Sequence, residues 1–277
     1  NVVGTVAVGR APVAIGRFIA GSSAPVFPDT LTGLWWNPAE PGWGVHVAHR
    51  GNRIFAAWFT YNASGAPKWY VSSDCTLNSP SPPPTFTTEV TCTGNVYETT
   101  GPRFFSDPYN AGAVNVTKLG LFQMGFSDRN TGAMSVVIGS AVKTMPLKRQ
   151  VFRGEGPTPA IDYTDLWWNP AESGWGVGIT QQFGTMFLAW FAYDDSGAPT
   201  WYVASNCAVN AGGNGCSGEL YRTSGPPDPI RNPFDASRVN VSKVGSITVS
   251  FTDANSGTMS YTVDGRSGTK TITRQLF

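Results

Sequence analysis

Residues 34–45 read Leu-Trp-Trp-Asn-Pro-Ala-Glu-Pro-Gly-Trp-Gly-Val, and residues 166–177 read Leu-Trp-Trp-Asn-Pro-Ala-Glu-Ser-Gly-Trp-Gly-Val. Only Pro41 and Ser173 differ between the two stretches. The match continues at the same spacing, since residues 57–61 and 64–71 recur as residues 189–193 and 196–203 with few changes. Self-similarity on this scale is the signature of a duplicated structural unit.

The duplication divides the chain into two domains. The ten tryptophans fall at equivalent positions, five in each copy: Trp35, Trp36, Trp43, Trp58 and Trp69, then Trp167, Trp168, Trp175, Trp190 and Trp201. We expect an extended N-terminal arm over residues 1–30, one repeat over 31–153 and a second over 162–277. The Gly- and Pro-rich stretch 154–161 reads as the linker between them.

Each repeat has the pattern of a chain of strands and contains no convincing helix. In the second repeat the candidate strands are residues 165–169, 176–182, 186–193, 200–205, 218–223, 246–252, 258–263 and 269–277. Turn sequences such as Asp194-Asp-Ser-Gly197 separate them, and residues 224–244 form the one long irregular loop. We therefore predict an all-β protein whose repeats are antiparallel up-and-down barrels of about eight strands each.

The strand order resembles that of the avidin and lipocalin type of barrel. In those families a Trp on the first strand packs under an Arg or Lys from the last strand. The resemblance implies that Trp35 or Trp36 meets Arg149 and that Trp167 or Trp168 meets Arg274. Copy 2 has Asp165 where the family pattern has Gly. The Trp-Trp-Asn-Pro-Ala-Glu-x-Gly-Trp-Gly block also resembles a repeat of secreted bacterial proteins of unknown function, which implies no activity.

The composition excludes several classes of partner. Charged residues make up 13% of the chain and the formal net charge is +1, without a cluster of Lys or Arg. Nucleic acids and anionic membranes would require such a cluster, so neither is an expected partner. No apolar run approaches the ~20 residues of a membrane helix. The first residue is Asn1 rather than Met, as removal of an export signal or a shortened chain would leave it.

Each repeat carries two cysteines on either side of the same connection, Cys75 and Cys92 in copy 1 and Cys207 and Cys216 in copy 2. The connection changes length while the cysteines stay. A disulfide tolerates this because it requires only that the two ends lie close together. We predict one disulfide per repeat, hence an oxidising compartment and an extracellular or cell-surface protein.

Candidate catalytic and metal-binding groups are few. Glu40 and Glu172 lie in the most similar block, but neither has a second carboxylate beside it, so each is expected to pair with Arg149 or Arg274 or to cap a turn. His46 and His49 are three residues apart on a strand and point to opposite faces, which disfavours a shared metal ion. We predict a protein that is not an enzyme and has no cofactor.

Two segments contain Asp, Asn and Gly in an order similar to that of calcium-binding loops. Residues 128–132 and 253–257 read Asp-Arg-Asn-Thr-Gly and Asp-Ala-Asn-Ser-Gly, but no acidic residue closes either loop as an EF-hand requires. We expect hairpin turns here and no metal site.

Aromatic side chains alternate along the strands. In residues 187–193, Phe187, Phe191 and Tyr193 face one side of the strand, and Leu188 and Trp190 face the other. The barrel interior accepts one set, and the sister domain, the arm, another subunit or a ligand must cover the other. The candidate ligand or interface aromatics are Trp36, Trp43, Trp58, Trp69, Trp168, Trp175, Trp190 and Trp201.

The N-terminal arm belongs to neither repeat. Residues 2–19 are apolar, β-branched and partly alternating, which favours a strand that must pair with something to avoid aggregation. It either folds back on its own domains or adds to a neighbouring subunit. Its candidate assembly residues are Val3, Val6, Val8, Val13, Ile15 and Phe18.

Two functional hypotheses follow. The first is a non-enzymatic extracellular structural or interaction protein, a self-assembling surface-fibre or matrix subunit joined to copies of itself through residues 1–20 and the outer aromatic faces. The second is a secreted module that binds a carbohydrate or another small ligand in Trp-lined barrel mouths.

Overall fold

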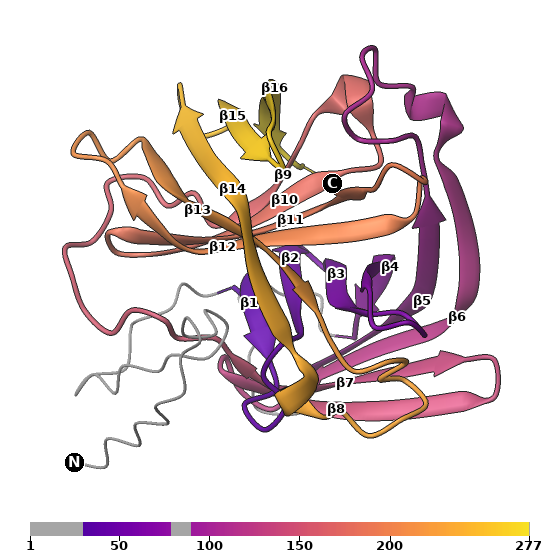
Figure 1. The fold of residues 1–277 in the computed structure, drawn as a ribbon. Helices are drawn as coiled ribbons and strands as arrows, with labels where there is room; N and C mark the ends of the chain where they lie inside the picture. The colour runs from indigo at the N-terminus through magenta and orange to yellow at the C-terminus, as the bar shows by residue number, and fades with distance from the viewer. Residues whose placement is uncertain (1–29, 79–89, 277) are drawn as a thin grey trace.

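The computed structural model describes residues 30–78 and 90–276, and this part of the chain forms two closed antiparallel barrels of eight strands each (Figure 1). The predicted fold class is confirmed, and the N-terminal arm, with its candidate assembly residues, lies outside the described residues. The strands of barrel 1 are β1 (Gly33–Trp36), β2 (Gly44–Arg50), β3 (Arg53–Tyr61), β4 (Pro67–Leu77), β5 (Val90–Thr100), β6 (Asn115–Phe126), β7 (Thr131–Ile138) and β8 (Ala141–Arg149).

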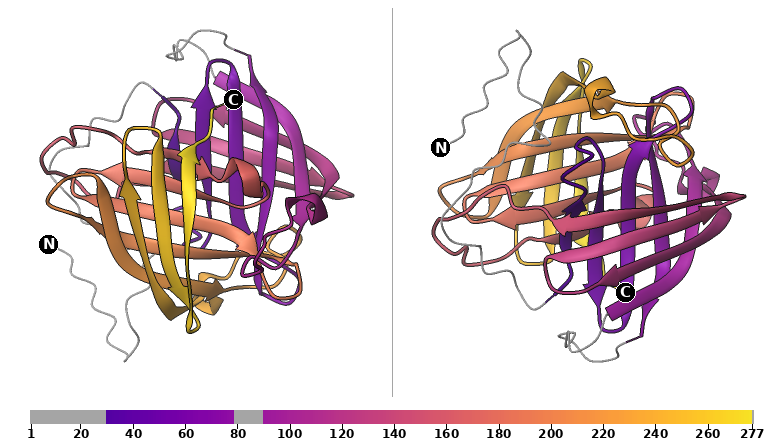
Figure 2. Two further views of the ribbon diagram at one scale, coloured as in Figure 1. Left: turned by 90° about the horizontal axis from the view of Figure 1, so that it is seen from above. Right: turned by 90° about the horizontal axis from the view of Figure 1, so that it is seen from below.

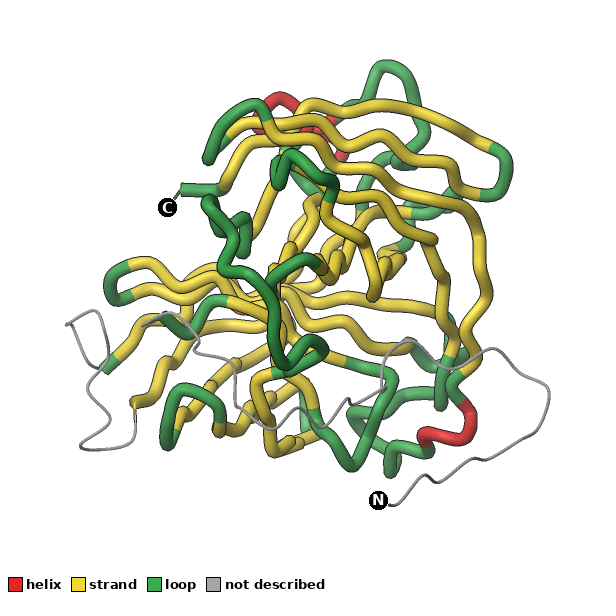
Figure 3. Tube along the Cα trace, turned by 90° about the vertical axis from the view of Figure 1, so that its left-hand side faces the viewer, coloured by secondary structure: helices red, strands yellow, loops and turns green. Residues whose placement is uncertain are grey.

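Barrel 2 repeats this order. Its strands are β9 (Asp165–Trp168), β10 (Gly176–Gln182), β11 (Thr185–Tyr193), β12 (Pro199–Val209), β13 (Gly215–Ser224), β14 (Asn240–Phe251), β15 (Ser256–Val263) and β16 (Arg266–Arg274). All eight predicted strands are present. β14 begins six residues earlier than predicted because its first residues pair with the end of β13. The only helices among the described residues are short 3₁₀ turns, drawn in red in Figure 3.

Each barrel closes between its first and last strands, and a Trp–Arg pair marks the closure. Trp35 pairs with Arg149 across β1 and β8, and the guanidinium carbon of Arg149 lies 4.9 Å from the centre of the Trp35 ring. Trp167 and Arg274 repeat the contact at 4.9 Å in barrel 2. The resemblance to avidin and lipocalin barrels left two candidate tryptophans in each repeat, and Trp35 and Trp167 are the ones that contact the arginines.

Inward-facing side chains fill both barrels. The interior of barrel 1 includes Trp35, Trp43 and Trp58, and that of barrel 2 includes Trp167, Trp175 and Trp190. Both predicted disulfides are present, Cys75–Cys92 and Cys207–Cys216, each with 5.3 Å between the Cα atoms.

The two barrels lie side by side (Figure 2), and the aromatic side chains on their outer faces form one buried cluster between them. Trp69 of β4 lies 5.0 Å from Phe191 of β11, and Trp201 of β12 lies 5.8 Å from Phe59 of β3, measured between ring centres. Of the covers weighed from the sequence, the sister domain is the one that buries these rings. Burial of this apolar layer favours association by ~25 cal/mol per Å² of surface removed from water.

Each barrel also receives a loop from the other. In Figure 1, β5 and β6 extend alongside barrel 2, and β14 extends down to barrel 1, so the loops that these strands carry lie on the opposite barrel. Residues 101–114 place Phe104 in the core of barrel 2, and residues 225–239 place Ile230 in the core of barrel 1. Backbone bonds fix the exchange, since Gly101 donates to Gly197 and Gly225 donates to Gly65.

Candidate ligand groove between the barrels

The predicted aromatic residues fall into separate environments. Trp58 and Trp190 lie inside the barrels, Trp69 and Trp201 lie in the layer between them, and Trp36 is 2% exposed. Trp168 is partly exposed on β9. Only Trp69, Trp168 and Trp175 of the candidate set line the open groove described below.

The exchanged loops occupy the ends of the barrels where a ligand was expected. The Phe104 ring lies 4.8 Å from Trp190 and 5.1 Å from Trp175, measured between ring centres. Ile230 belongs to the same buried cluster as Trp58 and Trp43 in barrel 1. The position expected for a ligand beside these tryptophans is therefore filled by the protein's own loops. The sequence signal for this was the apolar residues Phe104 and Ile230 inside otherwise irregular loops.

A groove of about 300 Å³ opens instead between the outer wall of barrel 1 and the β9–β10 connection of barrel 2. Its volume is at the small end of the range for small-molecule pockets. Its lining comes from β3 to β6 and the loop before β6 on one side, and from β9, β11 and flanking loops on the other: Phe55, Trp69, Val71, Ser73, Tyr97, Thr99, Val114, Val116, Trp168, Ser173, Gly174, Trp175, Phe191, Tyr193 and Gln275.

The repeat predicts a second groove of the same kind, but that one is closed. The equivalent hollow, lined by Trp43, Phe59, Phe187 and Trp201 among others, holds only about 20 Å³. The Phe152 ring packs 5.9 Å from that of Phe187, measured between ring centres.

A glutamine holds the chain over the closed groove. The Gln182 side-chain oxygen accepts hydrogen bonds from the backbone of Phe152 and Arg153, both at 3.0 Å, and its amide donates to the Gln150 carbonyl at 2.8 Å. The equivalent position in barrel 1 is Arg50, whose guanidinium is paired with Asp165. Phe277, the residue equivalent to Phe152, lies outside the described residues.

The floor of the open groove carries two buried hydroxyls. Tyr193 and Thr99 are 0% and 5% exposed, and neither hydroxyl makes a hydrogen bond of ordinary geometry within the described part of the chain. The equivalent phenol of Tyr61 donates to the Gly42 carbonyl at 2.6 Å. Burial raises the pKa of Tyr193 to about 12, an effect that the nearby Thr99 hydroxyl opposes. The Tyr193 phenol is therefore a neutral donor at physiological pH.

A second tyrosine lies close to Tyr193. Tyr109, from the exchanged loop, is 8% exposed, and its hydroxyl also lacks a partner among the described residues. Burial raises its pKa, and the proximity of Tyr193 adds to the effect. The equivalent residue of the second repeat is Phe234, so the closed groove lacks a hydroxyl at this position.

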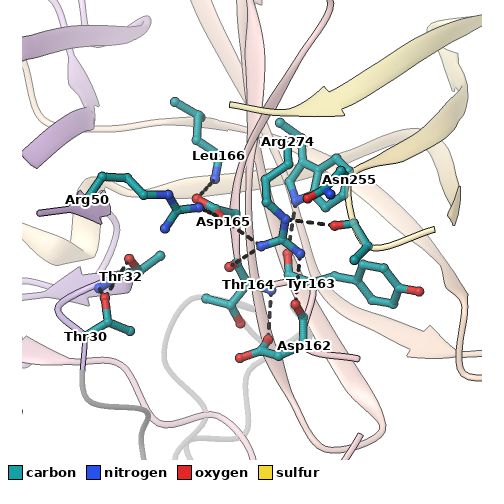
Figure 4. Close-up of polar contacts among 12 residues, drawn as sticks. Thr30, Thr32, Arg50, Asp162, Tyr163, Thr164, Asp165, Leu166, Asn255 and Arg274 are labelled. Atoms are coloured by element: carbon teal, nitrogen blue, oxygen red, sulfur yellow. Dashed lines mark hydrogen bonds and ion pairs between the residues drawn. The ribbon is translucent and has the colours of Figure 1, made fainter. Parts of the chain in front are cut away.

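Asp165 forms the most polar contact between the barrels (Figure 4). Its carboxylate binds the guanidinium groups of Arg50 and, at 2.8 Å, Arg274, and it accepts a hydrogen bond from the Leu166 backbone at 2.9 Å. The Asp165 side chain is 1% exposed, so these protein groups take the place of water around its carboxylate. Because a buried charge of this kind is stable only when fully paired, we assign Asp165 to the joining of the barrels.

The two histidines have different environments. His46 is fully buried at the interface against Gly178, where a Cβ atom would lie 2.4 Å from the imidazole Cγ. Burial lowers the pKa of His46 to about 4, and Asp165 opposes the shift. His49 lies within 2.9 Å of the Gly51 carbonyl through Nε2. No group of three potential metal ligands occurs in residues 30–78 and 90–276.

The remaining candidate groups have structural partners. Glu40 accepts a hydrogen bond from the Trp43 indole at 3.0 Å, and Glu172 binds the Trp175 indole at 3.3 Å and Lys270 at 2.7 Å. Their expected pairing with Arg149 or Arg274 was wrong, because those arginines bind backbone carbonyls and, for Arg274, Asp165.

The loops with calcium-loop character are hairpin turns. The Asp128 carboxylate accepts from the backbone of Asn130 at 2.7 Å, and Asp253 accepts from Asn255 at 2.7 Å. Each carboxylate is therefore used in holding its own turn.

Comparisons with known proteins give no relative: no family model matches the chain, and neither a curated protein nor a solved structure is significantly similar to it. In the described part of the chain, no helix has the length and apolar character needed to span a bilayer.

Proposed function

We propose that the protein is a binding protein of an extracellular or cell-surface compartment and that it takes a small neutral ligand in the open groove between its barrels. The observation that carries the proposal is a groove of about 300 Å³ between the barrels, lined by aromatic and aliphatic side chains and by hydroxyls. The two disulfides support the compartment, because they persist under oxidising conditions.

The lining argues for a neutral ligand with a large apolar surface. None of the residues that line the groove carries a formal charge at neutral pH, and most are aromatic or aliphatic. The polar groups among them are hydroxyls and one amide, which suit the orientation of a ligand rather than the capture of an ion. The two barrels would serve as a rigid frame, because burial of Trp69 and Trp201 between them fixes the walls.

Blocking the groove tests this function. Val116 is 62% exposed and lines the groove, so Val116→Trp would fill it with an indole. Val241 is the equivalent residue beside the closed groove, and Val241→Trp is the matched control. We expect acetophenone, followed by ligand-observed NMR and Trp fluorescence, to bind the wild type and V241W but not V116W. Equal binding to V116W and V241W, or no binding of any neutral ring or sugar probe to the wild type, would overturn the proposal.

A second candidate is the self-assembling structural subunit, favoured by an apolar stripe on barrel 1. Leu121, Val137 and Val142 are direct neighbours across β6, β7 and β8, and Leu121 and Val142 are 53% and 70% exposed. The equivalent positions of barrel 2 are Ser246, Thr262 and Ser267. An exposed apolar row that only one repeat carries suits contact with a second copy, and the apolar segment 2–19 is the proposed occupant.

Deletion of residues 1–25 tests this second candidate, with Leu121→Ser and Val142→Ser as surface variants. If the chain assembles, light scattering and electron microscopy will show oligomers or fibres in the wild type that each change shortens or abolishes. A wild type that is monomeric at all concentrations, or oligomers that survive all three changes, would overturn it.

A further inference from the structure

We propose that the surface joining the barrels is specific for unlike repeats: it fits repeat 1 (residues 31–153) against repeat 2 (residues 162–277) and rejects two copies of either repeat. The residues that carry this specificity are His46, Arg50, Asp165 and Gly178. The inference concerns the partner of this surface and is independent of any ligand in the groove.

Two equivalent residues meet at the centre of this surface. His46 of β2 and Gly178 of β10 occupy the same position in the aligned repeats. They also lie against each other, because a Cβ atom on Gly178 would fall 2.4 Å from the imidazole Cγ of His46. Around them, β1 packs against β10 and β2 packs against β9, which are equivalent pairs of strands. The axis that relates the two repeats therefore passes between His46 and Gly178.

A twofold axis between identical residues would require both side chains to fit the same space. The His46 side chain is fully buried, so it already fills the space opposite Gly178. A second imidazole there would overlap the first, and overpacking of a buried site is destabilising. Two glycines would instead leave a cavity of the size of an imidazole, which is also destabilising. Of these combinations, only a histidine opposite a glycine fills the position.

A one-sided ion pair adds to the difference in size. Arg50 of repeat 1 binds the carboxylate of Asp165 in repeat 2 (Figure 4). The residues equivalent to Arg50 and Asp165 are Gln182 and Gly33, which carry no charge.

Each pairing of like repeats would break this ion pair. In a pair of two repeats 1, Arg50 would face a glycine. In a pair of two repeats 2, Asp165 would keep Arg274 of its own barrel but would face a glutamine in place of Arg50. Because the Asp165 side chain is 1% exposed, the loss of a charged partner is not compensated by water. Charge and size therefore favour the same pairing.

The kind of partner follows from these contacts. Repeat 1 accepts repeat 2, and every chain carries one of each. If a barrel leaves its own sister, the surface accepts the unlike barrel of a second copy, in a head-to-tail arrangement, and not the like barrel.

Positions 46 and 178 allow all four combinations to be compared in the full-length chain. The wild type and the swap His46→Gly/Gly178→His are unlike pairs, whereas His46→Gly alone and Gly178→His alone are like pairs. We expect each like pair to lower the urea midpoint of unfolding by about 1 M, through the cavity or the overlap. The swap should regain most of the loss of Gly178→His, because it restores one imidazole at the axis.

Two control variants separate these contacts from general effects of substitution. His49 lies on the same strand as His46 but contacts the Gly51 carbonyl, so His49→Gly combined with Gly178→His should regain no stability. Arg50→Gln should lower the urea midpoint by about 0.5 M. Arg53→Gln, at an exposed position of the adjacent hairpin, should leave the midpoint unchanged.

The outcomes decide the proposal. Recovery in the swap, but not in the combination with His49→Gly, supports specificity for unlike repeats. A swap as unstable as Gly178→His, or single variants as stable as the wild type, overturns it. If Gly178→His does not fold, folding of the swap supports the proposal and failure of the swap to fold overturns it. Equal midpoints for Arg50→Gln and Arg53→Gln overturn the assignment of Arg50.

Discussion

Trp69 and Trp201 reach across the interface in opposite directions. The Trp69 indole of barrel 1 donates to the Ala192 carbonyl of barrel 2 at 2.9 Å, and the Trp201 indole of barrel 2 donates to the Thr60 carbonyl of barrel 1 at 2.9 Å. The duplicated sequence thus forms a contact with twofold pseudosymmetry within one chain. Each indole combines apolar burial with a hydrogen bond that only the other barrel provides.

Replacement of either indole should therefore weaken both barrels together. We expect Trp69→Phe and Trp201→Phe each to lower the free energy of unfolding by about 2 kcal/mol, through the lost hydrogen bond and the space left behind. Urea denaturation followed by circular dichroism measures the effect. Trp168→Phe is the control, because Trp168 is partly exposed. Variants at positions 69 and 201 that unfold at the wild-type urea concentration would contradict the prediction.

The exchanged loop predicts that a residue of one repeat stabilises the other barrel. Phe104 is fully buried among Trp175, Trp190 and Tyr261 of barrel 2, and we expect Phe104→Ala to cost about 3–5 kcal/mol. The adjacent Phe105 is only partly buried, so Phe105→Ala should cost clearly less. Thermal unfolding of the two variants measures the difference. Equal losses would mean that Phe104 is not the anchor of the loop.

Two equivalent tyrosines should respond differently to loss of the hydroxyl. Tyr61→Phe removes the hydrogen bond to Gly42 and should lower the free energy of unfolding by about 1 kcal/mol. Tyr193→Phe removes a buried hydroxyl without a partner among the described residues, so it should leave stability unchanged or raise it. The two variants alter the same atom type at matched positions, and urea denaturation compares them directly. Destabilisation of similar size in both would show that the Tyr193 hydroxyl is satisfied in the folded protein.

His46 should make the protein sensitive to mild acid. The unfolded chain takes up a proton on this imidazole near pH 6.5, whereas burial delays uptake in the folded protein to about pH 4. Between these values the unfolded state binds more protons, so stability falls as the pH falls, by roughly 3 kcal/mol from this group. Below pH 4 its contribution no longer changes.

The measurement is the free energy of unfolding from pH 7.5 to 3.5 for the wild type and for His46→Gln, which cannot titrate. The difference between the two profiles isolates the contribution of the His46 imidazole from those of all other groups, which are the same in both proteins. Parallel profiles across this range would contradict the assignment.

Much of the scaffold could be predicted from local patterns. Alternation in residues 187–193 separated Trp190 from Phe191 onto opposite strand faces, and the structure has Trp190 inside its barrel and Phe191 outside. The cysteine pairs could be assigned because each flanks one connection in both copies. These features depend on residues near in sequence or equal between repeats, so periodicity and self-comparison reveal them.

The candidate site could not be predicted in the same way. Trp69, Trp168 and Trp175 were identified as aromatics, but Tyr193 of β11 comes to line one groove with Thr99 of β5 and Val116 of β6 only when the two barrels pack together. The sequence left the cover of the outer face open among four candidates. The different contacts of Gln182 and Arg50, which occupy equivalent positions, could not be predicted either. Gln182 binds the backbone of Phe152 and Arg50 binds Asp165, and in each case the partner comes from the other repeat.

By itself, the sequence determined two disulfide-tied barrels and the two sets of side chains that lie on opposite faces of each strand, because strand periodicity and duplication are written into short stretches of chain. The tertiary structure decided how the barrels join, which loop fills which barrel, and which set of aromatic side chains faces the barrel interior. These depend on contacts between residues more than a hundred positions apart, such as the hydrogen bonds of Trp69 and Trp201, where small differences between the copies decide the packing.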